Sequence, residues 1–590
     1  MKLSDYICKF LSNYTNHVFS ITGGCVITLL DSIDKCYSIK NIPCQNEQGA
    51  SIAAEAYSRV KENGLGVALA TSGPGMINMM QGIASAHFDS IPVLYISGAP
   101  PLNHLKNGRK VKQFGFQEMD VVDIVKPITK YAVLLKDPNK IKYELEKLIY
   151  MAYEGNKGPV LLDIPDDIQR IEIDPKQLEP FVPVPKFDNH YLIDNQITET
   201  INSIERAKRP VVIVGGGVKI GNVEEKMKDF LNFSSLPFVT TWSTIDLFTE
   251  DNDNLIGNFG ISSNRYGNFA VQNADLIISF GSRLDTHQTG SDPSKFAPNA
   301  KKIVINIDNN ELYKDDGVNI DLKICCDLDM FLTKLNGFAI DLKDITVWKN
   351  RIVEWKEKYP ICLPEYYNQE DSVNPYVFMN ELSKETNEND IIITDAGATL
   401  TWTMQSYKIR NNQKLFSAFN HSPMGYSLPA SIGAQFAAFG ERIVCITGDG
   451  GMCMNIQELE TIVYNNLPVK IFLINNKGYG IIRQTQDTWM NSNYVGVDKN
   501  SGLGFPNIKG IAQAYGVPTI DINDHSDLNE TIRYVLNYDG YILCNVNVKP
   551  DEQILPKLVF GHGIEDMSPL LPRDELKEIM NNEENTTNTK

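Results

Sequence analysis

The sequence lacks several features that would assign it to a restricted class of proteins. No apolar run among its 590 residues approaches the about 20 needed to cross a membrane, and its start lacks a basic segment with a small-residue cleavage site. Basic residues are in deficit, since 55 Lys and Arg stand against 73 Asp and Glu, for a formal net charge of −18. This charge argues against a nucleic-acid or anionic-membrane surface. We therefore expect a cytoplasmic protein that binds neither nucleic acid nor membrane.

Metal-binding and redox patterns of cysteine are also missing. The ten cysteines are scattered, with no CxxC and no Cys/His cluster at zinc spacing, so we expect reduced thiols that pack in the interior. No internal repeat is visible, and the chain contains no GxGxxG dinucleotide fingerprint. The absence of that fingerprint weakens the hypothesis of a nucleotide-binding oxidoreductase, which a triple glycine at 215–217 would otherwise suggest.

The length and the apolar pattern predict three α/β domains. At about 150 residues per domain, the chain is long enough for three or four cores. Short apolar runs alternate with helix-like stretches, which is typical of doubly wound parallel sheets. We place the domains at 1–175, 190–337 and 373–548, with linkers at Pro175–Pro185 and Asp341–Pro375. A tail covers 549–590, whose acidic, Asn-rich end we expect to be disordered and whose 556–573 segment could fold over an active-site mouth.

In the third domain, two apolar runs end in polar residues. The first run ends at Gly448-Asp449-Gly450 and the second at Asn475-Asn476, with helical spacing over 454–465 between them. A strand–turn–helix–strand unit places both ends at the carboxyl edge of one parallel sheet, where such sheets bind ligands. An aspartate, an amide oxygen and a backbone carbonyl suit Mg²⁺, while the glycine turn and helix N-terminus suit a diphosphate. The alternative is an ordinary Asp-Gly turn and an Asn cap.

Three segments of the first domain are further candidates. Glu47 follows a short strand and opens an Ala-rich helix, where a carboxylate is also favoured by the helix dipole alone. The TSGPGMIN segment, 71–78, puts glycines between a strand and a helix. The FGFQEMD segment, 114–120, lies in a loop that could be either a substrate wall or plain surface.

Together, these motifs resemble those of thiamine-diphosphate enzymes, and the chain resembles the acetolactate synthase branch over about residues 1–560. The resemblance implies a pyrimidine-binding first domain, a central nucleotide-binding-like domain and a diphosphate-binding third domain. It implies a homodimer or homotetramer, because the sites of the family lie between the first domain of one subunit and the third of another. Glu47 and Asp449 would then meet only in the oligomer.

The resemblance also assigns roles to individual residues. Glu47 would activate thiamine diphosphate, Phe116 and Gln117 would face the substrate, and Asp449, Asn476 and the Gly478 carbonyl would hold Mg²⁺. The residues implied to bind thiamine diphosphate are Gly24, Thr71, Pro74, Asn78, Gly397, Ala398, Thr399, Met424, Gly448, Gly450, Gly451, Met454 and Tyr479. Gly215, Gly216, Arg283 and Asp308 resemble the FAD site of the branch.

Four positions depart from the pattern of the family. Asn46 stands where a histidine is common, and Asn306 and His287 replace Asp and Arg of the FAD site, so FAD stays an open alternative. Thr485 stands where a tryptophan usually favours 2-oxobutanoate as acceptor. A smaller polar side chain there opens space for a bulkier or more hydroxylated acceptor, unless Trp489 compensates.

The sequence therefore predicts decarboxylation of a 2-oxo acid, pyruvate by preference, and transfer of the acyl carbanion to an acceptor carbonyl. The cofactor is the electron sink, and the protein positions the reactants. A nucleotide-activated ketosugar as acceptor, or simple decarboxylation, are the alternatives. A non-catalytic relative is a further hypothesis, which the presence of Glu47 disfavours.

Overall fold

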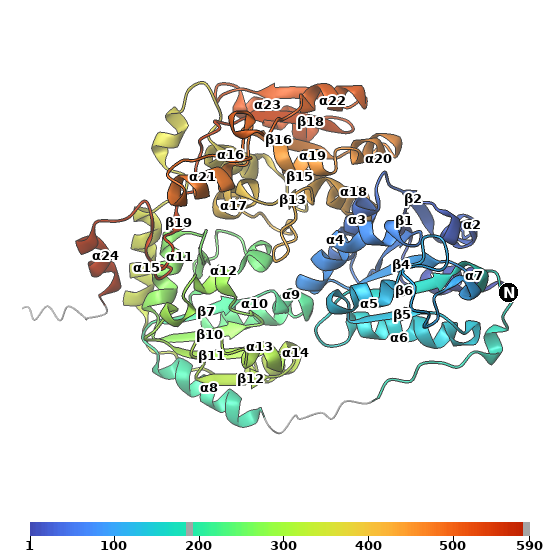
Figure 1. The fold of residues 1–590 in the computed structure, drawn as a ribbon. Helices are drawn as coiled ribbons and strands as arrows, with labels where there is room; N and C mark the ends of the chain where they lie inside the picture. The colour runs from blue at the N-terminus through green and yellow to red at the C-terminus, as the bar shows by residue number, and fades with distance from the viewer. Residues whose placement is uncertain (185–192, 582–590) are drawn as a thin grey trace, which may run out of the picture.

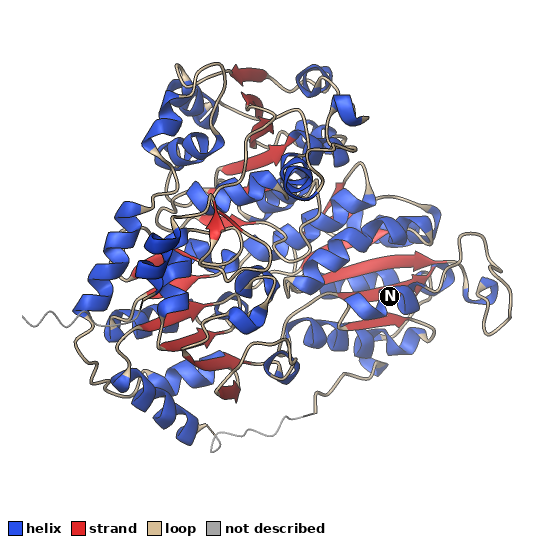
Figure 2. Ribbon diagram, turned by 60° about the vertical axis from the view of Figure 1, so that its left-hand side comes forward, coloured by secondary structure: helices blue, strands red, loops and turns tan. Residues whose placement is uncertain are grey.

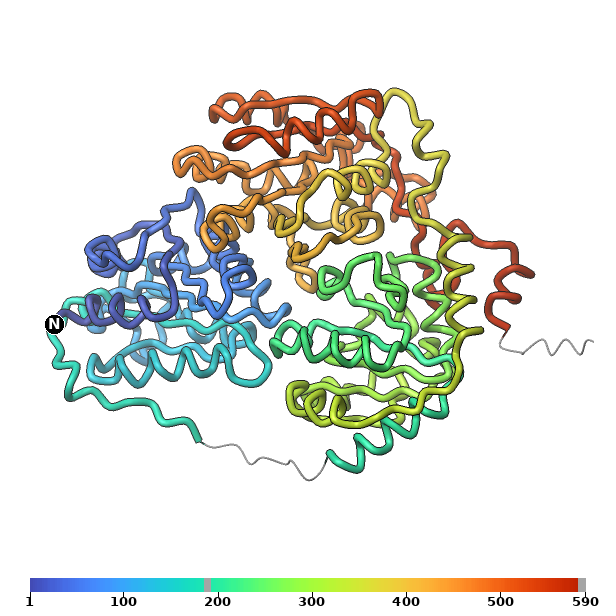
Figure 3. The backbone as a smooth tube through the Cα atoms, turned by 180° about the vertical axis from the view of Figure 1, so that it is seen from behind, coloured from blue at the N-terminus to red at the C-terminus, as the bar shows by residue number. Residues whose placement is uncertain are grey.

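The computed structural model describes residues 1–184 and 193–581. Three six-stranded sheets lie at the corners of a triangle, an arrangement seen from the front and from behind (Figure 1, Figure 3). Helices cover both faces of the sheets (Figure 2). The end of the first linker and most of the segment predicted to be disordered lie outside the described residues.

All strand pairs in the three large sheets are parallel, which confirms the predicted α/β class with three parallel-sheet domains. The first sheet has the order β2-β1-β3-β4-β6-β5, the second β12-β11-β10-β7-β8-β9 and the third β14-β13-β15-β16-β18-β17. The strands of the first sheet are β1 (His17–Ser20), β2 (Lys40–Pro43), β3 (Gly66–Ala70), β4 (Val93–Ala99), β5 (Tyr131–Leu134) and β6 (Val160–Pro165). Those of the second are β7 (Pro210–Val214), β8 (Phe238–Thr240), β9 (Leu255–Asn258), β10 (Leu276–Phe280), β11 (Lys301–Asn306) and β12 (Leu322–Cys325). Those of the third are β13 (Ile391–Thr394), β14 (Lys414–Phe416), β15 (Ile443–Gly448), β16 (Lys470–Asn475), β17 (Thr519–Ile522) and β18 (Ile542–Asn547).

The first and third sheets share one hydrophobic core through two helices. Helix α3 (Glu47–Val60) packs on α18 (Ser427–Ala437), and both contribute small buried side chains. A Cβ placed on Gly433 of α18 would overlap the Ala53 carbonyl of α3, so the two backbones are in direct contact. Close contact of this kind requires small residues on both helices.

A buried ionic network lies at the same junction. Arg59 of α3 pairs with Glu55 at 2.5 Å and with Asp89 at 2.6 Å, and the Tyr426 hydroxyl donates to Glu55 at 2.6 Å. Asp89 also accepts the backbone N–H groups of Phe419 and Asn420. Removing one partner from such a buried network leaves a charge uncompensated, so the network holds the two domains in one relative position.

The tail does not end at the third sheet. It crosses to the central domain, forms a short hairpin of β19 (Lys557–Leu558) and β20 (Met567–Ser568), and ends in α24 (Arg573–Met580) beside α11 (Arg265–Asn273) and α15 (Thr346–Lys358) (Figure 1). Asn268 of α11 donates to the Ile564 carbonyl at 2.8 Å, and Arg265 donates to the Met567 carbonyl at 3.2 Å. None of the helices in 1–184 and 193–581 is both long and apolar enough to cross a bilayer.

Candidate active site

Strands β15 and β16 are parallel neighbours, as the sequence predicts for the two polar strand ends. Gly448 pairs with Ile474 in the register of the sheet, so the residues that follow lie at the same edge. The helix after the first strand begins at Asp449 itself, as α19 (Asp449–Met454), and α20 (Glu458–Tyr464) follows after a break. The helix predicted over 454–465 is present as α20, but it begins only at Glu458, after a break at 455–457. Asn455 at the break turns inward and donates to the Gly425 carbonyl at 2.8 Å.

The Asp449 carboxylate is 2% exposed and is oriented by backbone groups from both strand ends. It accepts the Gly450 N–H at 2.7 Å and the Gly478 N–H at 3.2 Å. Burial raises its pKa to about 7, and the backbone N–H groups of Gly450, Gly478 and Lys477 offset that rise only in part. Asn476, also buried, follows β16 directly. In the described ranges no three His, Cys, Asp or Glu side chains gather as a metal cluster, and the expected ligand set contains only one such side chain.

Other predicted residues of the third domain gather around the glycine turn. A Cβ on Gly450 would overlap the Tyr479 ring and lie 2.9 Å from Met424 Cε, and one on Gly448 would lie 3.1 Å from Thr399 Oγ1. Gly397, at φ 72°, precedes α17 (Ala398–Ser406). The structure thus brings these predicted residues to the carboxyl ends of β13, β15 and β16. Met454 belongs to the same group but is 46% exposed.

The predicted residues of the first domain form a second group. Asn78 of α4 (Pro74–Phe88) donates from Nδ2 to Glu47 Oε2 at 3.0 Å. Thr71 lies against Gly23 and close to Gly75, while a Cβ on Gly24 would meet no atom within 4 Å. Glu47 is half-buried in the single chain, rather than fully buried. The turn, the helix start and the carboxylate thus face one volume.

Phe116 and Gln117 lie in a compact loop that is built around a residue the sequence reasoning missed. The Glu118 carboxylate is 6% exposed and accepts the N–H groups of Phe114, at 2.8 Å, and Lys106. Gln117 has φ 59°, and a Cβ on Gly73 would lie 2.6 Å from its carbonyl oxygen, so the loop packs on the 71–75 turn. Phe116 is 84% exposed.

A second missed carboxylate joins the two groups. Glu458 of α20 is fully buried and accepts the N–H groups of Gln45 and Asn46 at 3.1 and 3.0 Å, together with the Thr461 hydroxyl at 2.7 Å. Burial raises its pKa to about 7. Its two backbone partners lie more than 400 positions earlier in the chain, so no local pattern marks this contact.

The central-domain residues lie apart and have partners of their own. Cβ atoms on Gly215 and Gly217 would overlap or crowd the backbone at 281–282, so packing alone accounts for these glycines. The Asp308 carboxylate caps α13 (Asn309–Leu312) by accepting the Asn310 N–H at 2.9 Å. Arg283 donates to Asn420 Oδ1 at 2.5 Å. His287 packs edge-on against Trp242, with ring centroids 4.2 Å apart.

Thr485 lies on α21 (Gly480–Trp489), which settles its relation to Trp489. Because residues four apart share a helix face, the two side chains are neighbours. The Thr485 hydroxyl donates back to the Ile481 carbonyl at 2.9 Å. The tail borders this helix, since Gln484 exchanges two 3.0 Å hydrogen bonds with the backbone of Ile554, and Trp489 packs edge-on against Phe560.

Comparison with known proteins covers most of the chain. Three family models match: the thiamine pyrophosphate enzyme N-terminal TPP binding domain at residues 1–124, the central domain at 197–335, and the C-terminal TPP binding domain at 395–546. The matched ranges contain each of the two residue groups described above.

Among curated proteins, the acetolactate synthase large subunit of Porphyra purpurea is 32% identical over 561 residues, covering 92% of this chain and 91% of the relative. Acetolactate synthase 1, chloroplastic, of Nicotiana tabacum is 32% identical over 96% of this chain and 84% of its own. The large subunit of Cyanidium caldarium is 31% identical over 98% of this chain and 97% of its own.

Proposed function

Because the chain belongs to the thiamine pyrophosphate enzymes, and within them to the acetolactate synthase family, we propose that it decarboxylates pyruvate and transfers the resulting acyl carbanion to an acceptor carbonyl. The observation that carries this proposal is the buried Asp449 carboxylate, held by both strand ends beside Asn476. When bound, thiamine diphosphate supplies the electron sink for the carbanion.

Asp449, Asn476 and the Gly478 carbonyl would hold Mg²⁺ and, through it, the diphosphate. The residues fit this role, because a hard dication takes oxygen ligands and the buried Asp449 carboxylate and Asn476 amide lie at the ends of neighbouring strands. The turn at 448–451 and the start of α17 would offer backbone N–H groups to the phosphate oxygens. Met424, Met454 and Tyr479 supply apolar contact beside them.

Glu47 would take and return the proton that activates the cofactor. The Asn78 amide orients the carboxylate by binding Oε2, which leaves Oε1 for the exchange. The half-burial of Glu47 and the exposure of Met454 in a single chain support a homo-oligomer in which a second subunit completes the site. Phe116 and Gln117 would form one wall for the substrates.

The side chains of α21 bear on which molecule accepts the acyl carbanion. A second pyruvate, giving acetolactate, is the acceptor that the family membership favours. A nucleotide-activated ketosugar is the second candidate, favoured by Thr485, whose short side chain leaves room on this face of the helix. Trp489 on the same face would stack on a sugar or a base. Simple decarboxylation, in which a proton takes the place of the acceptor, is the third candidate.

FAD is not required by any step of this proposal. The packing of Gly215 and Gly217 accounts for the triple glycine without a flavin, and Asp308 and Arg283 are engaged by protein groups. Flavin absorbance of the purified protein decides whether it is bound.

The function is tested with pyruvate alone and with pyruvate plus candidate aldehydes and ketosugars, by measuring CO₂ release and identifying products by mass spectrometry. Glu47→Gln should lower CO₂ release by about 100-fold or more, which is the usual contribution of a positioned general acid–base. Glu62→Gln, an exposed glutamate near the end of the same helix, is the matched control. Unchanged CO₂ release in Glu47→Gln would refute the assignment, and acetolactate formed readily from pyruvate alone would exclude the ketosugar.

A further inference from the structure

A buried carboxylate lies directly behind the glycine turn of the candidate active site. Asp395 follows β13, and its side chain is 1% exposed. Its Oδ1 accepts the N–H groups of Ala396 at 2.8 Å and of Gly425 at 2.9 Å. Its Oδ2 accepts the Ser427 N–H at 3.1 Å and the Ser427 hydroxyl at 2.9 Å. This one carboxylate therefore joins the end of β13 to the turn that precedes α18.

The same carboxylate packs against the glycine turn itself. A Cβ on Gly451 would lie 2.6 Å from Asp395 Oδ1, so a side chain at this position would displace the carboxylate. The turn before α18 carries Met424, whose side chain reaches the glycine turn. Gly425 is held on both sides, because its N–H is bound by Asp395 and its carbonyl accepts from Asn455. The two peptide groups that follow Met424 are therefore fixed in orientation.

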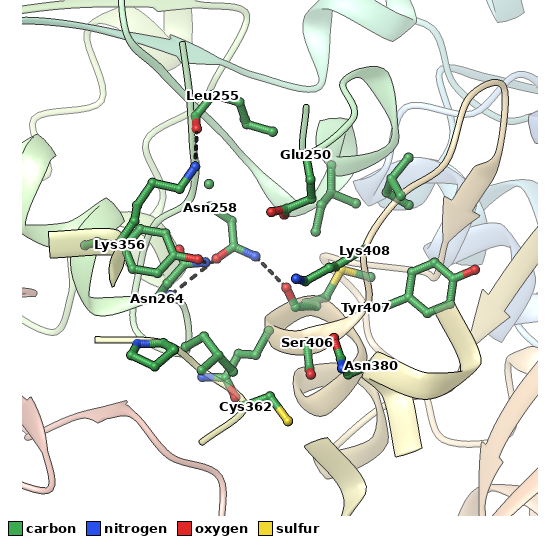
Figure 4. Close-up of a pocket in the computed structure, with 18 of the residues that line it drawn as sticks. Glu250, Leu255, Asn258, Asn264, Lys356, Cys362, Asn380, Ser406, Tyr407 and Lys408 are labelled. Atoms are coloured by element: carbon green, nitrogen blue, oxygen red, sulfur yellow. Dashed lines mark hydrogen bonds between the residues drawn. The ribbon is translucent and has the colours of Figure 1, made fainter. Parts of the chain in front are cut away.

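Asp395 is attached to elements that are themselves held in place. Strand β13 pairs with β14 on one side and with β15 on the other. Helix α17 begins three residues after Asp395 and ends beside the central domain. There Asn258 donates from Nδ2 to the Met404 carbonyl at 2.6 Å, at the wall of a cavity of about 310 Å³ between the two domains (Figure 4). Asp395 is thus a fixed point to which the 424–427 turn is bound.

The other end of β13 has a buried aspartate with a different kind of partner. Asp390 is 3% exposed and pairs with Arg442 at 2.5 Å, as buried carboxylates commonly do. Among the described residues, Asp395 has no ion-pair partner, and burial raises the pKa of its carboxyl group. A buried carboxylate without a cation costs stability that its hydrogen bonds return only in part. Groups of this kind are typical of functional sites.

We propose that Asp395 is a positioning residue of the candidate active site, which holds Met424 against the glycine turn at 448–451 and so shapes the volume that would receive thiamine diphosphate. This inference rests on the proposed function. Because the carboxylate is buried behind the turn, it acts through the backbone of Gly425 and Ser427. An amide in its place has one acceptor oxygen, so either Gly425 or Ser427 would lose its acceptor. The turn would then no longer be held at Gly451, and the affinity for the cofactor would fall.

The test measures the affinity of the full-length protein for thiamine diphosphate at fixed Mg²⁺ by isothermal titration calorimetry, together with kcat and KM for CO₂ release from pyruvate. Asp395→Asn should weaken cofactor binding by about tenfold or more, because the turn loses hydrogen bonds to a charged acceptor. At saturating cofactor, kcat should fall by about tenfold or more, since catalysis depends on exact placement of the reacting groups. KM for pyruvate should stay unchanged, because Met424 lies beside the cofactor volume.

Ser427→Ala is a milder variant, since it removes one of the four hydrogen bonds and keeps the backbone N–H. It should weaken cofactor binding several-fold without unfolding the protein. Ser431→Ala, at an equally buried position one turn along α18, is the matched control, because the Ser431 hydroxyl donates to the Ser427 carbonyl instead of Asp395. Asp390→Asn is the control for stability. It should lower the thermal unfolding midpoint and leave the cofactor affinity unchanged.

A double-mutant cycle with Met424→Ala tests the route by which Asp395 acts. If Asp395 acts through Met424, adding Asp395→Asn to Met424→Ala should weaken cofactor binding by no more than about twofold further. If the two residues act independently, the two losses of affinity should multiply.

Three results would overturn the proposal: unchanged cofactor affinity in both Asp395→Asn and Ser427→Ala, equal weakening in Asp390→Asn, or losses that multiply in the cycle. Each of them leaves the proposed function standing. Failure of the unaltered protein to bind thiamine diphosphate would instead refute the proposed function, and this proposal with it.

Discussion

The Glu458 carboxylate of the third domain accepts the N–H of Asn46, the residue before Glu47, at 3.0 Å. The same carboxylate accepts the Gln45 N–H and the Thr461 hydroxyl, so the start of α3 is fixed to the helix that follows the Asp449 turn. The position of Glu47 therefore depends on a group from the other end of the chain.

Glu458→Ala should lower the thermal unfolding midpoint and reduce CO₂ release. The change leaves two part-buried N–H groups without this acceptor, which costs at most about 1–3 kcal/mol each. Glu458→Gln should fall between Ala and the unaltered protein, because its amide oxygen still accepts one N–H. Differential scanning calorimetry and CO₂ release measure the two effects, with Glu460→Gln, at a half-buried position of the same helix, as the control. Equal midpoints for all variants would refute this dependence.

Asp449→Asn should weaken thiamine diphosphate binding by about tenfold or more at fixed Mg²⁺, because the dication loses the one charged side chain of its proposed protein ligands. Without ligands, the variant should unfold no earlier than the unaltered protein, since burial disfavours the ionised carboxylate that it replaces. Cofactor affinity is measured by quenching of intrinsic fluorescence, and Asp539→Asn at the surface is the control. Undiminished affinity would remove Asp449 from the metal site.

Glu118→Ala should loosen the loop that carries Phe116 and Gln117. The loop contains four trypsin sites, at Lys106, Arg109, Lys110 and Lys112, so cleavage there should become several-fold faster. KM for pyruvate should rise, while thiamine diphosphate affinity stays the same. Asp120→Asn, which removes only the surface ion pair with Lys106, is the matched control. A cleavage rate that does not change would mean that Glu118 does not hold the loop.

The buried carboxyl group of Asp163 should make the free energy of unfolding depend on pH. Among the described residues, its buried carboxyl is bonded only by the Ser97 hydroxyl, at 2.7 Å, and burial raises its pKa from 3.8 to about 7. The folded protein therefore binds this proton more tightly than the unfolded chain does. Its stabilising contribution is complete below pH 3.8 and is lost as the pH rises to about 7.

The thermal unfolding midpoint should accordingly fall between about pH 4 and about pH 7, and Asp163→Asn should flatten part of that slope. Glu458, whose pKa burial also raises to about 7, contributes in the same direction and keeps some slope in the variant. Asp123→Asn at the surface should leave the slope unchanged. A slope that Asp163→Asn does not alter would contradict the assignment.

The sheets and one half of the candidate site could be predicted from sequence because their signals are local. Buried parallel strands are continuous apolar runs, and each of the two polar ends at Asp449 and Asn476 directly follows such a run. The grouping of Thr399, Met424 and Tyr479 around the glycine turn followed only from resemblance to a family.

The remaining features depend on contacts between distant segments. Glu118 and Glu458 act through backbone N–H groups, which carry no side-chain signature, and Glu458 reaches across more than 400 positions. The break after α19 depends on Asn455 turning to the Gly425 carbonyl, which no helical periodicity reveals. The course of the tail over the central domain depends on its contacts with Asn268 and Arg265 of α11. In the sequence alone, nothing distinguishes these two residues from other polar residues of a helix.

The contact of Gly433 with Ala53 packs the backbones of α18 and α3 directly against each other, between the first and third sheets. At this contact no side chain lies between the two backbones, so no change of rotamer could let α3 slide along α18. Beside it, Arg59 pairs with both Glu55 and Asp89, which fixes the same arrangement. These two units therefore move as one block. A cross-link engineered between α3 and α18 should therefore leave turnover intact.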